Sequence, residues 1–401
     1  VTLSNGSVIT IKAGESVGTV VVDTPANDAY NNGSTVSTTI TGATGGNFEN
    51  LVPNTTPAVT TITDSIDTTT VSLTATDAIT EGGQITYTAT LTNPAQTPVT
   101  VTLSNGSVIT IKAGESTGTV VIDTPANDVY NNGSTVSTTI TGATGGNFEN
   151  LVPSTTPAVT TITDSIDTTT VSLTATNTVT EGGQITYTAT LTNPAQTPVT
   201  VTLSDGSVIT IKAGESVGTV VVDTAPNDVY VNGSTVSTTI TGATGGNFEN
   251  LVPNTAPAVT TITDSIDTTT VTLTAPSEAN EGGQITYTAT LSNKAGTDVT
   301  LKLDNGSSIT IKAGDTVGSV TVAAPSDDVF IDKSTQTVKI TDTTGGNFEK
   351  LEVAGDGATT TINDTIDKVD VVLTATTTVG EGGNIIYTAS LVDKNGAPVT
   401  N

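Results

Sequence analysis

Acidic side chains recur at fixed positions in this chain, and they are the residues best suited to chemistry. Within residues 68–167 they are Glu81 in the run EGG, Asp128 in the run TPANDVY, and Asp164 and Asp167 in the run TDSID. Acids stand at the same positions one and two repeats later. The chain has no His and no Cys. Carboxylate oxygens without nitrogen or sulfur ligands are typical of a Ca²⁺ site.

The candidate metal ligands are the carboxylates at these positions in every copy. They are Asp28, Asp64, Asp67, Glu81, Asp128, Asp164, Asp167, Glu181, Asp228, Asp264, Asp267, Glu281, Asp327, Asp328, Asp364 and Asp367. Asp123 is the weakest further candidate, because the fourth copy has Ala323 at its position. The alternative interpretation is that all of these are solvated loop acids and backbone caps that bind no ion.

Self-similarity sets the frame in which these acids must be placed. The run VTLSNGSVITIKAGES begins at residue 1 and again at 101, and it returns at 201 with one Asp replacing Asn. The segment DSIDTTT separates the copies, and we therefore frame three full repeats between two partial ones. The five segments are 1–67, 68–167, 168–267, 268–367 and 368–401. Because Val1 falls inside a repeat, we expect the chain to be part of a longer protein.

Alternating apolar residues predict short strands within each repeat. In 68–167 the alternation marks seven of them, with Tyr87 on the apolar face of the second. Thr, Val, Gly, Ser and Asn dominate the composition, which favours strands and turns. The sequence therefore predicts an all-β fold, in which tandem immunoglobulin-like β-sandwich repeats of about 100 residues form a linear array. We expect Tyr130 and Phe148 to pack in the core beside Tyr87.

Sandwich topology indicates where the acids meet. The connection between the first two strands and that between the fifth and sixth lie at the same pole as the C-terminus of such a domain. The acids of these loops are therefore expected to converge there, where the next repeat brings its opposite-pole loop with Asn247 and Glu249. They are Glu81, Asp123 or Asp128, and Asp164 or Asp167. Carboxylates packed at such a junction repel one another unless a cation lies between them. The sequence thus predicts structural Ca²⁺ between neighbouring repeats.

Charge and composition exclude several classes of function. The chain has 39 acidic and 11 basic residues and a net charge of −28, so nucleic acid and anionic membrane surfaces are poor partners. It has no apolar stretch of about 18 residues, so we expect no direct insertion into a membrane. The absence of His and Cys and of any G-x-S-x-G run argues against an enzyme.

The same residues carry a resemblance to a known family. The runs EGGQITYTATLTNPAQTPVT, ITIKAGES and GATGGNFENLVP resemble the repeats of the giant Lap-type biofilm adhesins of Pseudomonas. More loosely, EGG and the NDxY loop are similar to Calx-β domains, whose matching acids bind calcium. The resemblance implies an RTX adhesin exported by type I secretion, held at the outer membrane and exposed at the cell surface. Its repeats would be extenders that project a distal adhesive region for surface attachment and biofilm formation.

Two further expectations follow. The repeats could instead be adhesive modules that bind glycans or abiotic surfaces, although no aromatic residues are left over for a sugar site. Residues 368–401 supply the first two strands of a repeat and residues 1–67 supply the rest. The tail of one molecule could therefore complete the head of another, giving head-to-tail self-association.

Overall fold

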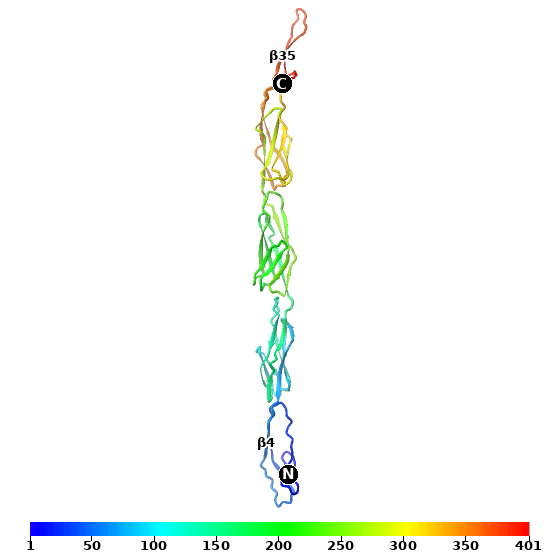
Figure 1. Ribbon diagram of the computed structural model, residues 1–401, viewed down its shortest axis with the longest axis vertical. Helices are drawn as coiled ribbons and strands as arrows, with labels where there is room; N and C mark the ends of the chain where they lie inside the picture. The colour runs from blue at the N-terminus through cyan, green and yellow to red at the C-terminus, as the bar shows by residue number, and fades with distance from the viewer. Residues whose placement is uncertain (401) are drawn as a thin grey trace. The chain divides into compact units, whose positions relative to one another are not determined.

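The computed structural model describes residues 1–400, and every regular element within that range is a β-strand (Figure 1). No helix long and apolar enough to cross a membrane occurs among those residues. The chain forms two compact units. The first comprises Val1–Thr170, Thr192–Thr197 and Gly245–Val252, and the second comprises the remaining described residues.

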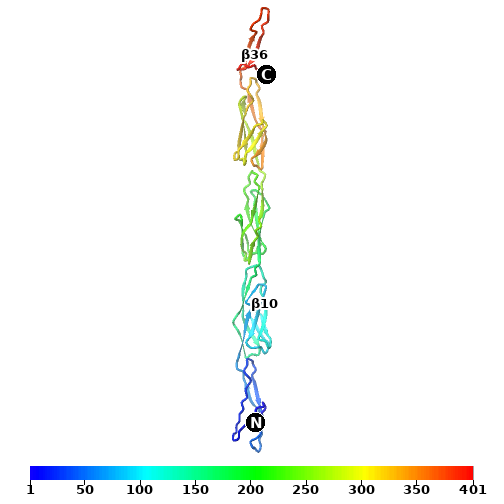
Figure 2. The same ribbon diagram turned by 90° about the vertical axis from the view of Figure 1, so that its right-hand side faces the viewer.

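The repeat at 68–167 lies in the first unit and contains ten strands. They are β5 (Thr68–Ala75), β6 (Ala78–Thr80), β7 (Gln84–Leu91), β8 (Val99–Leu103), β9 (Val108–Ile111), β10 (Thr117–Asp123; Figure 2), β11 (Ser134–Thr138), β12 (Ile140–Gly145), β13 (Asn150–Pro153) and β14 (Ala158–Thr163). All seven strands that the alternation predicts are present. The prediction missed β6 and β13, and it joined β11 to β12, which Thr139 separates.

The other full repeats have the same order of strands. In 168–267 they are β15 (Thr168–Ala175), β16 (Thr178–Thr180), β17 (Gln184–Leu191), β18 (Val199–Leu203), β19 (Val208–Ile211), β20 (Val217–Asp223), β21 (Ser234–Thr238), β22 (Ile240–Gly245), β23 (Asn250–Pro253) and β24 (Ala258–Thr263). In 268–367 they are β25 (Thr268–Thr274), β26 (Glu278–Asn280), β27 (Gln284–Leu291), β28 (Val299–Leu303), β29 (Ser308–Ile311), β30 (Val317–Ala323), β31 (Ser334–Val338), β32 (Ile340–Gly345), β33 (Lys350–Ala354) and β34 (Ala358–Asn363).

The two partial copies hold fewer strands. The first contains β1 (Thr2–Leu3), β2 (Ser34–Thr38), β3 (Ile40–Gly42) and β4 (Ala58–Ile62). The last contains β35 (Asp370–Ala375) and β36 (Tyr387–Val392), which pair as an antiparallel hairpin.

Two layers of strands build the repeat 68–167. One layer has the order β10-β7-β5-β13, in which β13 runs parallel to β5. The ladders β11-β14-β6 and β12-β8-β9 form the other, and they join because only Thr139 separates β11 from β12. Burial alternates along β5, β7, β8 and β14, so each layer has one face in the core. Two layers of mostly antiparallel strands, packed on a shared core, form the immunoglobulin-like sandwich that the sequence predicts.

The copies differ in the hydrogen bonding of the buried tyrosine in each core. Tyr87 is 1% exposed, and its hydroxyl lies 2.9 Å from the Thr138 hydroxyl, so the buried polar group is satisfied. Tyr187 and Thr238 make the same contact at 2.8 Å. The corresponding Tyr287 is fully buried, and its hydroxyl has no hydrogen-bond partner. Val338 occupies the position of the threonine there, and burial is the main cause that raises the pKa of Tyr287.

This difference predicts opposite effects for one substitution. Tyr87→Phe removes a hydrogen bond and leaves the Thr138 hydroxyl unpaired, so it should destabilise its repeat by about 1–2 kcal/mol. Tyr287→Phe removes an unpaired buried hydroxyl and should stabilise its repeat by up to about 1 kcal/mol. Hydrogen exchange of the β7 and β27 amides, measured in the full chain at increasing urea concentrations, gives the free energy of unfolding of each repeat separately. Equal destabilisation by both substitutions would contradict the assignment.

Candidate metal centre

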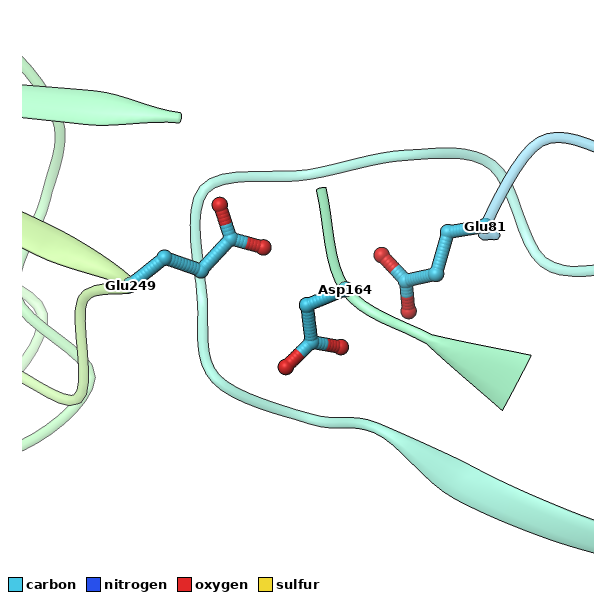
Figure 3. A group of neighbouring side chains, drawn as sticks. All are labelled: Glu81, Asp164 and Glu249. Atoms are coloured by element: carbon cyan, nitrogen blue, oxygen red, sulfur yellow. The ribbon is translucent and has the colours of Figure 1, made fainter. Parts of the chain in front are cut away.

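Three groups of three carboxylates lie close together in the described chain. They are Glu81, Asp164 and Glu249 in the first unit, and Glu181, Asp264 and Glu349, with Glu281, Asp332 and Asp364, in the second. Within each group, one oxygen from each residue lies within 4.8 Å of the other two. Figure 3 shows the first group, with the Glu81 and Glu249 carboxylates on either side of Asp164.

Glu81 owes its position to the two glycines that follow it. Its backbone N–H donates to the Thr163 carbonyl at 3.1 Å, which fixes the turn between β6 and β7 against the end of β14. Gly82 has a φ of 71°, in the region that disfavours residues with a Cβ. A Cβ on Gly83 would lie 2.5 Å from a side-chain carbon of Ile79. The run EGG is therefore the local sequence that places this glutamate at the pole.

Asp164 follows directly after β14 and anchors the neighbouring loop. Its Oδ2 accepts the Asn132 backbone N–H at 3.1 Å. Asp128, in the same loop, accepts the Tyr130 backbone N–H at 2.7 Å and the Asn132 side-chain amide at 3.0 Å. These bonds hold the β10–β11 connection beside Glu81 and leave Asp164 Oδ1 buried without a partner.

Glu249 belongs to the next repeat. Its backbone N–H donates to the Val129 carbonyl at 3.1 Å, and its Oε2 accepts the Asp167 backbone N–H at 2.6 Å. Its other oxygen, Oε1, is buried without a hydrogen-bond partner. The first group therefore combines carboxylates from two consecutive repeats. Asp267 and Glu349 repeat the second of these contacts at 2.5 Å.

The electrostatics of the groups disfavour full ionisation. Burial is the main cause that raises the pKa of Glu81, and Asp128, Asp164 and Glu249 raise it further, while the Asp128 backbone N–H opposes them. The pKa of Glu181 is raised in the same way, by burial first and then by the charges of Asp228, Asp264 and Glu349. These shifts arise because several acids share one poorly hydrated space.

The pKa of Glu281 is raised to about 7. A hydrogen bond with the Asp332 side chain is the largest cause, followed by burial and by the charges of Asp332, Asp364 and Asp328.

The orphaned oxygens fit a bound cation. Glu81 is 9% exposed, and Glu81 Oε2, Asp164 Oδ1 and Glu249 Oε1 are all buried without a partner. Within residues 1–400, none of the ion pairs involves a member of the three groups. Buried acceptors that face one another without a donor carry a large desolvation cost unless a cation replaces the water. Oxygen-only donors of this kind match Ca²⁺.

The structure brings only part of the predicted set together. Glu81, Glu181 and Glu281 meet Asp164, Asp264 and Asp364 as expected, and Asp128, Asp228 and Asp328 lie alongside as neighbouring charges. Metal binding by any of them stays a prediction.

The remaining candidates make other contacts. Asp167 accepts the Asn127 side-chain amide at 2.6 Å, and Asp267 accepts that of Asn227 at the same distance. Asp327 accepts the Thr365 hydroxyl, and Asp367 lies 3.9 Å from Lys394 Nζ. In the first partial copy, Asp64 accepts two backbone N–H groups, Asp28 accepts the Tyr30 N–H, and the Asp67 N–H donates to Glu149.

Sequence reasoning missed three members of the groups. It placed Glu249 at the junction but did not count it as a ligand, and it did not count Glu349 as a ligand either. The run NFE could have identified both glutamates, because the predicted topology places its loop at the pole that faces the preceding repeat. Asp332 was missed altogether, although it replaces the Asn found at positions 132 and 232.

Aromatic pairs accompany the carboxylates at each junction. Tyr130 stacks on Phe248 with ring centroids 5.6 Å apart, and its hydroxyl donates to the Pro194 carbonyl at 2.7 Å. Equivalent pairs join Tyr30 to Phe148 at 5.7 Å and Tyr230 to Phe348 at 5.8 Å. The prediction that Tyr130 packs in the core of its own repeat is therefore wrong. Its ring contacts Phe248 of the next repeat, and its backbone N–H donates to Asp128 in the same loop.

Comparisons with known proteins identify one family. The LapA domain matches the chain four times in succession, at residues 1–65, 67–165, 167–265 and 267–365. No curated protein matches the chain. Among solved structures, the chain is similar to one described as the "tetra-tandem repeat in extending region of large adhesion protein". The two are 14% identical, and the match covers 82% of this chain and 89% of that one with a TM-score of 0.30.

The raised pKa values predict the pH dependence of the metal-free protein. A folded-state pKa above the unfolded value of 4.5 means that the folded state binds the proton more tightly. The resulting stability is present below pH 4.5 and is lost as the pH rises through about 7 for Glu281. In chelator, the melting temperature should therefore be higher at about pH 5.5 than at about pH 8. Glu281→Gln should flatten this profile, and a melting temperature that rises steadily over the same range would contradict it.

Proposed function

The chain belongs to the LapA domain family, and on that premise we propose that it is a non-enzymatic extender of a large cell-surface adhesin whose inter-repeat junctions are stiffened by Ca²⁺. The observation that carries the proposal is the set of buried, unpartnered oxygens contributed by two consecutive repeats. Glu81 and Asp164 belong to one repeat and Glu249 to the next. A site divided in this way is occupied fully only while the two repeats are held together.

Calcium would act at the junction as a crosslink. Ca²⁺ accepts six to eight oxygen ligands in flexible geometry. In the first group, Glu81, Asp164 and Glu249 would hold it, and the Asp128 carboxylate stands close enough to raise the pKa of Glu81. Bound calcium supplies the positive charge that neutralises these acids. Without it the carboxylates repel, and the facing loops separate more readily.

Membership of the family supports a proposal for the biological setting. We propose that the parent protein is extracellular, leaves the cell by type I secretion and is retained at the outer membrane. The repeats would project a distal adhesive region for attachment and biofilm formation. Because each repeat contacts only its neighbours, the stiffness of the array would be set junction by junction.

Calcium removal tests the proposal. In the full chain, we expect calcium to raise the melting temperature and to increase the maximum dimension measured by small-angle scattering, since closed junctions do not bend. Glu249→Gln with Glu349→Gln should reduce both effects. Glu115→Gln with Glu215→Gln is the matched control, because these glutamates are exposed and lie outside the three groups. An identical melting temperature and maximum dimension in calcium and in chelator would contradict the proposal that calcium stiffens the junctions.

A further inference from the structure

Two loops from consecutive repeats pair through their backbones within the first unit. The Asn131 N–H donates to the Asn247 carbonyl at 2.9 Å, and the Glu249 N–H donates to the Val129 carbonyl at 3.1 Å. The two bonds run in opposite directions, as they do between antiparallel strands, so they fix the register of the loops. One of them holds the backbone of Glu249, which supplies a carboxylate to the first group.

Side chains add to this backbone pairing. Tyr130 and Phe248 form an antiparallel β-bridge, and their rings stack. Phe248 is 9% exposed, and the Tyr130 hydroxyl donates to the Pro194 carbonyl at 2.7 Å. These contacts involve no charged group, so they do not depend on a bound cation. We call the paired segments, residues 129–131 and 247–249, the clasp.

The run GGNFE gives the second segment of the clasp its shape. Gly245, Gly246 and Asn247 have φ values of 99°, 84° and 59°, all in the left-handed region. Glycine adopts this region freely, and asparagine tolerates it better than most residues with a Cβ. In the equivalent loop of the next repeat, a Cβ on Gly346 would lie 2.5 Å from the Phe348 ring. This turn therefore presents an aromatic ring and a glutamate in succession.

The clasp fixes a side chain that would otherwise be mobile. Besides its bound N–H, Glu249 has an Oε2 that accepts the Asp167 backbone N–H at 2.6 Å. Its Oε1 is buried without a partner, and one of its oxygens lies within 4.8 Å of oxygens of Glu81 and Asp164 (Figure 3). A free glutamate loses rotamer freedom when it binds a cation. Here that loss has already occurred on folding.

The same arrangement recurs in the second unit. The Glu349 N–H donates to the Val229 carbonyl at 3.1 Å, and Tyr230 stacks on Phe348. Val231 stands where the first clasp has an asparagine, and its N–H still donates to the facing carbonyl at 3.0 Å. Glu349 is a member of the second carboxylate group and also has a buried oxygen without a partner. The aromatic pair and the shared glutamate therefore occur together in both groups.

We propose that the aromatic pairs Tyr130–Phe248 and Tyr230–Phe348 are positioning residues of the cation sites. They donate no ligand, and they set the cation affinity by holding in place the glutamate that follows each phenylalanine. This inference rests on the proposed function, because it concerns the same sites. Apparent affinity falls with the fraction of molecules in the binding-competent state, so a weaker clasp means weaker binding. By linkage, a bound cation strengthens the clasp in turn.

Calorimetric titration of calcium into the chelator-treated full chain tests the inference. A Glu281→Gln background removes one carboxylate of the third group, so that the titration reports the first two. There, Phe248→Leu with Phe348→Leu should weaken calcium binding by about two- to tenfold, because the aromatic pairs are lost and the carboxylates of both groups are kept. Tyr130→Phe with Tyr230→Phe keeps the rings and should weaken binding less. Unchanged affinity in the leucine variant would overturn the inference.

Two controls separate positioning from a general loss of stability. Leu203→Ala removes a buried side chain from the repeat that contains Phe248, so it should lower the melting temperature in chelator without changing the calcium affinity. With Glu249→Gln and Glu349→Gln added, the effect of the leucine substitutions should fall below about twofold, because the positioned carboxylates are gone.

The outcomes distinguish the inference from the function on which it rests. An equal effect of the leucine substitutions with and without the two glutamates, or an equal loss of affinity in Leu203→Ala, would overturn the positioning role and leave the extender proposal standing. A wild-type chain that binds no calcium would overturn the calcium proposal, and the inference with it.

Discussion

Repulsion between buried carboxylates is the constraint on which the organisation of this chain depends. Each full repeat brings a glutamate and an aspartate to one pole. Backbone hydrogen bonds hold the loops there, so that the carboxylates cannot easily move apart. Three oxygens of the first group remain buried without a donor. Such an arrangement is unfavourable by itself and becomes favourable when a cation completes it. In the proposed extender, the stability of the junction would therefore depend on a bound cation.

The junction also has contacts that need no ion. The ring of Tyr130 stacks on Phe248, and the Asp167 backbone N–H donates to Glu249. Offset aromatic pairs of this kind contribute about 0.5–1.5 kcal/mol beyond the area they bury. These contacts set the approach of the two loops and bring Glu249 within reach of Glu81. Aromatic packing therefore helps to position the carboxylates, and the charge of the carboxylates is the reason that we propose a metal ion at the junction.

Differences between nearly identical copies show what individual side chains do. Where Val338 replaces the threonine found in the other full repeats, a buried tyrosine hydroxyl loses its partner. Where Asp332 replaces asparagine, a hydrogen-bond donor becomes a third carboxylate. The strands on either side have the same positions in all full repeats, because neither side chain takes part in the hydrogen bonds between strand backbones. The fold tolerates them, and their effects are confined to the core or to the pole of one repeat.

The repeat, most of its strands and the pole at which the acids gather could be predicted from the sequence alone. Strand formation follows a local two-residue period, and turn glycines such as Gly82 and Gly83 mark their positions directly. Which carboxylates meet could not be predicted, because it depends on contacts that form only in the folded chain. Glu249 lies near Glu81 although it belongs to the next repeat, and Asp332 lies near Glu281 and Asp364. Tyr130 contacts Phe248 of the next repeat and does not pack in the core of its own. These contacts join loops far apart in the sequence, and their geometry depends on backbone hydrogen bonds and side-chain packing that no periodic pattern records.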